Sequence, residues 1–198
     1  MDATYEHALD IIGCGFIVCD TLTFPDSPIM QISLVEQAGP HGSPFACYVP
    51  SREIALASGI QEFRESESDQ ERYCIFLPDF EQNLEVIYGI YCAAYECVFP
   101  YLGKPAPETV CLAIAAHEVR HRYQMSRKPA FFSGQENHDA GMDIARFLIQ
   151  NMPLCPWYSP KRYAMETDAR CVEAMIAHLE YSTVDDRSLV RILTAQPQ

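Results

Sequence analysis

The sequence predicts an α+β fold in which a small antiparallel sheet in the N-terminal half packs on a helical C-terminal half. Residues 16–49 contain short apolar runs of the β type, separated by turn residues rich in proline and glycine. From about residue 80 the apolar segments become longer, and Pro107 and Pro160 each stand where a helix would begin. These two observations predict sheet first and helices afterwards.

Short strands are expected in the first half because runs rich in β-branched and aromatic residues lie between turn signals. Ser51 is a typical N-cap residue, and the segment after it predicts a short helix from Arg52 to Ala57. The charge-dense residues 62–71 predict a solvated loop. The expected strands are Phe16–Cys19, Ile29–Val35, Phe45–Val49 and Tyr73–Leu77.

Helices are expected throughout the second half. Pro107 suits the first position of a helix, and Glu108 places a favourable negative charge in its first turn. Ser159 followed by Pro160 predicts an N-cap and first position for another helix. The expected helices are Phe80–Phe99, Pro107–Met125, a segment from Asn137 or Asp139 to Asn151, and Ser159–Tyr181.

One domain is expected over residues 1–198, mainly sheet over 1–79 and mainly helical over 80–198. A chain of 198 residues with 48% hydrophobic residues can bury a core of its own. The 14 Lys and Arg against 27 Asp and Glu give a net charge of −13, which is the wrong sign for binding nucleic-acid phosphates. The prediction is therefore a protein that does not bind nucleic acid as its main ligand.

A cytoplasmic setting is expected. The apolar run Val86–Tyr95 is too short to cross a bilayer, and the N-terminus carries acidic residues where a secretory signal would be basic. The nine cysteines form no Cys-x-x-Cys pair, which a zinc ribbon or a thioredoxin-like motif would need. Most of them lie among apolar residues, so we expect reduced thiols in the core.

The segment from His117 to His121 has the form His-Glu-x-x-His and falls within the expected helix that begins at Pro107. Residues four apart on a helix point the same way, so both imidazoles can reach one Zn²⁺ while Glu118 approaches the water bound to it. The preceding segment Val110–Ala116 is apolar on every side, which predicts a central helix. Polar groups at the end of a buried helix are costly to desolvate unless something binds them.

A simpler alternative is an amphipathic helix whose charged end reaches solvent. In that case Glu118 would pair with Arg122, four residues further along the same helix. The segment would then hold no metal.

A catalytic zinc site needs a third protein ligand and keeps a fourth position for water. The longer pattern with a third histidine is excluded, because Gln124 and Arg127 stand at its Gly and His positions. The expected helix from Ser159 offers an acid instead, at Glu166 or Asp168. Further options for the third ligand are Glu136, His138 and Asp139.

With a Glu on a downstream helix and an Ala three residues after it, the chain resembles the compact gluzincin metallopeptidases over residues 107–180. This broad group includes ImmA/IrrE-like proteins. The resemblance implies a zincin-like fold in which Glu118 is the general base. It implies the zinc ligands His117, His121 and Glu166.

The chain departs from larger gluzincins at Arg170, where an acid often orients a ligand histidine. Asp168 could orient the histidine instead, or could itself be the ligand. Glu166, Arg170 and Glu173 could equally form a solvated ladder of ion pairs beside an apolar stripe.

The sequence therefore predicts a zinc-dependent peptidase that acts on a protein or peptide. The alternative is an inactive or weakly active metallopeptidase-like module that binds a protein partner. A DNA-associated metalloprotease is disfavoured by the acidic composition and by the absence of paired cysteines.

Overall fold

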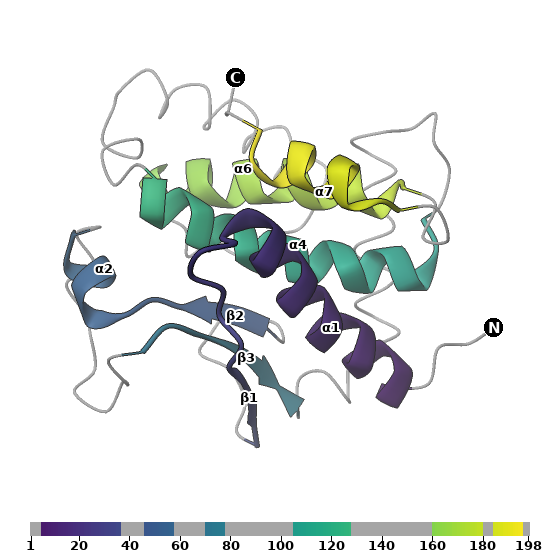
Figure 1. The fold of residues 1–198 in the computed structure, drawn as a ribbon, viewed down its shortest axis with the longest axis horizontal. Coiled ribbons are helices and arrows are strands. Elements are labelled where there is room, and N and C mark those ends of the chain that lie inside the picture. Colours follow the sequence, from purple (N-terminus) through teal and green to yellow (C-terminus); the bar gives the residue numbers. More distant parts are fainter. Residues whose placement is uncertain are drawn as a thin grey trace.

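Helix α4 (Pro107–Arg127) runs through the middle of the fold (Figure 1). Helices α6 (Pro160–Ala177) and α7 (Asp186–Leu193) lie on one side of it and a small sheet on the other, while α1 (Tyr5–Thr23) crosses it. The computed structural model describes residues 5–36, 46–57, 70–77, 105–127, 160–179 and 184–195. Within these residues the predicted combination of a small sheet packed on helices is confirmed, with the His-Glu-x-x-His segment on the central helix.

The sheet has three strands in the order β1-β3-β2, comprising Ile32–Val35 (β1), Arg72–Phe76 (β3) and Ala46–Val49 (β2). Strand β2 is antiparallel to β3, but β1 is parallel to β3, so the prediction of an antiparallel sheet is wrong for one pair. The reason is that β3 inserts between the two earlier strands instead of adding at an edge. Such a non-local pairing leaves no trace in the apolar pattern of each strand.

The N-terminal segment is a helix where a strand was expected. Phe16–Cys19 lies inside α1, where Ile17 is partly buried and Val18 is exposed. The buried positions follow the spacing of three and four residues that defines one helix face. They are Ala8, Ile11, Ile12, Gly15, Phe16, Cys19, Asp20 and Thr23. The helical period of three to four residues outweighs the local β propensity, so the described residues before position 80 include a long helix as well as the strands.

The other predicted elements within the described residues are confirmed. Helix α2 (Arg52–Ala57) follows Ser51, whose Oγ accepts a hydrogen bond from Ile54 N at 3.4 Å. Strands β2 and β3 and helices α4 and α6 stand where they were expected, to within a few residues at their ends. Helix α7 was not expected; Asp185 caps it through a 2.8 Å hydrogen bond from Ser188 N. The predicted helices over 80–99 and 137–151 lie outside the described residues, as does nearly all of the predicted loop.

The core joins all of these layers. Tyr73 of β3 stacks on Phe16 of α1 with 4.5 Å between ring centroids, and Tyr48 of β2 packs against Tyr73. Residues 109–117 of α4 are all buried, as the apolar run predicts. Side chains of α6 and α7 close the other side of the core, among them Val172 and Leu193. No helix among the described residues is long and apolar enough to cross a membrane.

The cysteines match their prediction in part. The six described cysteines are all free thiols, and Cys19, Cys74 and Cys111 are buried, whereas Cys14 is exposed. Burial, followed by the charge of Asp20, raises the pKa of Cys19 to about 12. This thiol is therefore protonated at neutral pH and behaves as a small apolar core residue.

Helices α1 and α4 lie close together at Gly15. A Cβ atom at this position would lie 2.9 Å from Ala115 Cβ and 3.3 Å from Leu112 Cδ1. At Gly13, in contrast, a Cβ atom would meet only Ile32 Cδ1, at an ordinary 4.0 Å. Glycine is thus needed for packing at one of these two helical positions.

We expect Gly15→Ala to lower the free energy of unfolding by about 1 kcal/mol, because overpacking of about 1–3 kcal/mol exceeds the gain in helix propensity of about 1 kcal/mol. Gly13→Ala is the matched control and should be neutral or stabilising. Urea denaturation of both variants measures the difference. A Gly15→Ala protein more stable than wild type would contradict the close approach of the two helices.

Candidate metal centre

Three side chains of α4 converge on one point. The ligand atoms of His117, Glu118 and His121 all lie within 4.8 Å of one another, and this group could hold a metal ion. The two Nε2 atoms are 3.0 Å apart, with the imidazole rings nearly perpendicular. Two nitrogen ligands of a tetrahedral zinc ion stand about 3.3 Å apart, given bond lengths of about 2.0–2.1 Å. The spacing therefore fits a shared metal after a small adjustment.

The first histidine is oriented by a buried acid from α6. His117 Nδ1 lies 2.8 Å from Glu173 Oε2, and the Glu173 side chain is fully buried. A carboxylate can only accept here, so Nδ1 carries the proton and donates. The hydrogen bond thereby fixes both the ring orientation and the tautomer, as outer-shell carboxylates do in metal sites.

The second histidine is oriented through an amide. His121 Nδ1 lies 2.9 Å from Gln124 Oε1, and Gln124 Nε2 donates to Asp168 Oδ2 at 2.7 Å. The amide group must face the carboxylate with its nitrogen, so its oxygen faces the imidazole. In both histidines, therefore, Nδ1 is the donor and Nε2 faces the centre of the cluster.

Glu118 is held from the sheet side. Its Oε2 accepts a 2.9 Å hydrogen bond from the backbone N–H of Tyr48 in β2, and its Oε1 lies 4.0 Å from His117 Nε2. The Glu118 side chain is 13% exposed. One carboxylate oxygen is thus fixed by the strand while the other is turned toward the histidine pair.

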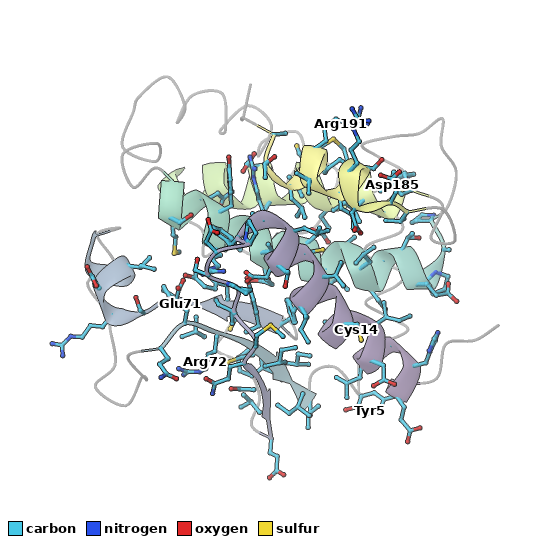
Figure 2. The ribbon with its side chains drawn as sticks, viewed as in Figure 1. Tyr5, Cys14, Glu71, Arg72, Asp185 and Arg191 are labelled. Atoms are coloured by element: carbon cyan, nitrogen blue, oxygen red, sulfur yellow. The ribbon has the colours of Figure 1, made fainter. Side chains whose placement is uncertain are left out.

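Arg122 does not pair with Glu118, so the solvated-helix alternative is wrong on this point. Arg122 is buried, and its Nη1 contacts both carboxylate oxygens of Asp20, which is fully buried in α1, at 2.7 and 2.9 Å. Weaker hydrogen bonds of 3.3 and 3.4 Å reach Glu71, the residue before β3 that is labelled in Figure 2. Arg120, Arg122 and Gln124 of the motif helix are therefore buried inside the protein.

Two tyrosines extend this network to the sheet. Tyr73 donates its hydroxyl proton to Asp20, and Tyr48 donates to Glu71. Burial is the largest cause that raises the pKa of each phenol, and the acid partner raises it further. Both hydroxyls therefore stay protonated as donors at neutral pH.

The charge of Arg122 is also maintained. Burial by itself would lower the pKa of Arg122, but the hydrogen bonds and charges of Asp20 and Glu71 raise it overall. The guanidinium group additionally lies 4.0 Å from the centroid of the Phe24 ring. A buried arginine is stable here because acids and an aromatic face surround it.

Asp168 accepts hydrogen bonds from Arg120 and Gln124. Its Oδ2 accepts from Arg120 Nε at 2.7 Å and from Gln124, and its Oδ1 accepts from Arg120 Nη2 at 3.0 Å. Both oxygens thus already accept hydrogen bonds, and Asp168 as third ligand stays a prediction. The alternative role given to it, support of a histidine, agrees with these contacts.

The third ligand stays a prediction. Position 166 lies in α6, but its side chain is outside what the structure describes, and so are Glu136, His138 and Asp139. Residues seven apart share a helix face, so position 166 lies on the face of α6 that carries Glu173. The predicted ladder of ion pairs on this face is wrong for Glu173, which is buried against His117.

Sequence reasoning missed three residues that support the cluster: Glu173, Gln124 and Asp20. A signal exists for Glu173, because it follows Ala169 by four residues and precedes Ile176 by three, and both of these are buried. An acid within such an apolar arc needs a partner. Asp20 stands next to the buried Cys19 at the end of α1, but only the three-dimensional structure brings Arg122 to it.

No protein-family model matches the chain, and neither does any curated protein or solved structure compared with it. The cluster of His117, Glu118 and His121 in a helix is compatible with the zincin motif. Function must therefore be argued from the geometry of this site.

We expect Asp20→Ala to lower the free energy of unfolding by about 3 kcal/mol, because it leaves much of the buried Arg122 charge without compensation. Asp26→Ala, at an exposed position nearby, is the control and should change stability by less than about 0.5 kcal/mol. Denaturant unfolding measures both. Equal, small effects for the two variants would show that the Asp20–Arg122 pair contributes little.

Proposed function

We propose that this chain is a zinc-dependent peptidase whose metal is bound by His117, His121 and Glu166. The observation that carries the proposal is the pair of Nε2 atoms 3.0 Å apart beside the Glu118 carboxylate, with each Nδ1 donating to a partner. Two neutral imidazoles with this tautomer turn their lone pairs toward one another. A cation between them removes that repulsion.

Zinc is the metal that best fits this donor set. Neutral imidazole nitrogens at the spacing of a tetrahedral site, with an adjacent carboxylate, are typical of catalytic zinc. Glu166 is proposed as third ligand because Asp168 is bound to Arg120 and Gln124, and because position 166 shares the helix face of Glu173. Three protein ligands leave one position for water.

Bound zinc would supply Lewis-acid chemistry, polarising a carbonyl group and lowering the pKa of a water molecule toward about 7. Glu118 would then accept the proton of the attacking water and deliver it to the leaving amine. Its hydrogen bond from Tyr48 N holds the carboxylate in place for both steps. The buried hydrogen bonds to Glu173 and Gln124 keep both imidazoles in one orientation, so little reorganisation is needed.

The proposed substrate is a protein or peptide, and the proposed setting is the cytoplasm. The net charge of −13 makes nucleic acid a poor partner. A chain that binds zinc at this site without hydrolysing peptides would instead be a binding module, and the next variant separates the two.

We expect one zinc ion per wild-type chain, and Glu118→Gln should keep it while hydrolysing a casein-type protein substrate about 10²–10⁴-fold more slowly, since a base acts only as the transition state forms. Elemental analysis and a protease assay on the same samples test this. His117→Ala is the control that should lose both metal and activity. Zinc binding together with no cleavage by wild type would favour the binding module.

Glu166→Ala should behave as the loss of a ligand. Zinc affinity is expected to fall first and activity with it, and excess zinc should restore part of the activity. A surface carboxylate would instead change stability by less than about 0.5 kcal/mol and leave the zinc content complete. Competition with a chromophoric chelator measures the affinity. Full zinc affinity in Glu166→Ala would exclude it as the third ligand.

A further inference from the structure

We propose that Gln124 and Asp168 are positioning residues that determine which ring nitrogen of His121 faces the metal. The inference rests on the proposed zinc site and concerns its assembly. Gln124 lies one turn beyond His121 on α4, and Asp168 lies across the helix interface on α6. Neither of them needs to touch the metal for this role.

The chain of hydrogen bonds from Asp168 through Gln124 to His121, called the relay below, begins at the Asp168 carboxylate, which is held in one orientation. Arg120 donates to both oxygens of Asp168, at 2.7 and 3.0 Å, and Arg120 is itself 99% buried. Its remaining hydrogen bonds, each 2.7 Å long, reach the carbonyl oxygens of Leu193 and Ala195 at the end of α7. Asp168 is therefore a fixed, charged acceptor.

A fixed acceptor orients the amide beside it. Gln124 is buried and donates from Nε2 to Asp168 Oδ2 at 2.7 Å, so Oε1 must point the other way, toward His121 Nδ1 at 2.9 Å. With the amide reversed, its nitrogen would face His121 and its oxygen would face the carboxylate. That arrangement sets two acceptors against each other and is strongly disfavoured.

The consequence reaches the metal through the imidazole. An amide oxygen beside Nδ1 requires the proton there, which leaves Nε2 as the ligand atom. A reversed amide would favour the proton on Nε2, and this proton would have to be moved before a metal could bind. The relay therefore does for His121, through an intermediate amide, what Glu173 does directly for His117.

The first test removes the amide. We expect Gln124→Leu, which keeps the approximate volume of the side chain, to weaken zinc binding about 10- to 100-fold, the usual effect of losing an outer-shell partner. Gln31→Leu makes the same substitution at an exposed position in the segment before β1 and should leave zinc affinity unchanged. Chelator competition gives both values, and circular dichroism establishes that both variants are folded.

The second test asks whether Asp168 acts through Gln124. Asp168→Asn replaces the carboxylate, which only accepts, with an amide, which can also donate. The Gln124 amide is then no longer held in one orientation, so zinc binding should weaken about tenfold. In the Gln124→Leu background the same substitution should have no further effect on zinc affinity. A purely structural role, such as holding Arg120, predicts an equal loss in both backgrounds and would overturn this part of the proposal.

A measurement on the metal-free protein keeps the inference separate from the peptidase proposal. Nitrogen-15 NMR of the His121 ring should show the proton on Nδ1 in wild type and a mixture of tautomers in Gln124→Leu. A proton on Nε2 in wild type, or unchanged spectra in the variant, would refute the relay even if the protein cleaves peptides. A confirmed relay in a protein that cleaves nothing would refute only the peptidase function.

Discussion

The burial of two arginines on either side of His121 is the constraint on which this fold depends. Arg120 turns toward α6 and α7, where Asp168 and two backbone carbonyls receive it, and Arg122 turns toward α1 and the sheet, where Asp20 and Glu71 receive it. Each guanidinium would be very costly to bury without these acceptors. One turn of α4 is thereby bound to α6 and α7 on one side and to α1 and the sheet on the other. His121 lies between the two arginines, so its backbone is held in place by both sets of contacts.

The polar residues of this turn of α4 form hydrogen bonds to different neighbouring elements. His117 is bound to α6, Glu118 to β2, and His121 to α6 through Gln124. Successive residues on a helix point about 100° apart, so one helix turn can address several neighbours at once. A cluster that could hold a metal ion is thus positioned by tertiary contacts from α6 and β2, and such contacts are what hold ligand groups in place before a metal binds.

Short sequence patterns correctly predicted helix starts, one helix cap and the histidine pair. Pro107 marked the start of α4, Ser51 capped α2, and the spacing of His117 and His121 identified the cluster. The strand predicted at Phe16–Cys19 is wrong because a helical repeat that extends over the whole of α1 outweighs the β propensity of this short segment. The parallel pairing of β1 with β3 and the partner of Glu173, which is His117, depend on residues distant in sequence, and no short pattern encodes them.

Glu118 and Arg122 bind different partners, and this determines which donor the Glu118 carboxylate receives. The two residues are four apart on one helix, the spacing at which acid and base normally pair on a surface. Here Arg122 is bound by Asp20 and Glu71, and Glu118 accepts from the neutral N–H of Tyr48 instead. An arginine partner would stabilise the charged form of a carboxylate strongly and so oppose its uptake of a proton. A neutral N–H donor stabilises the charged form less strongly. The fold thus satisfies the buried arginine with other acids, and the Glu118 carboxylate beside the histidine pair accepts a neutral N–H, which agrees with the general-base role proposed for it.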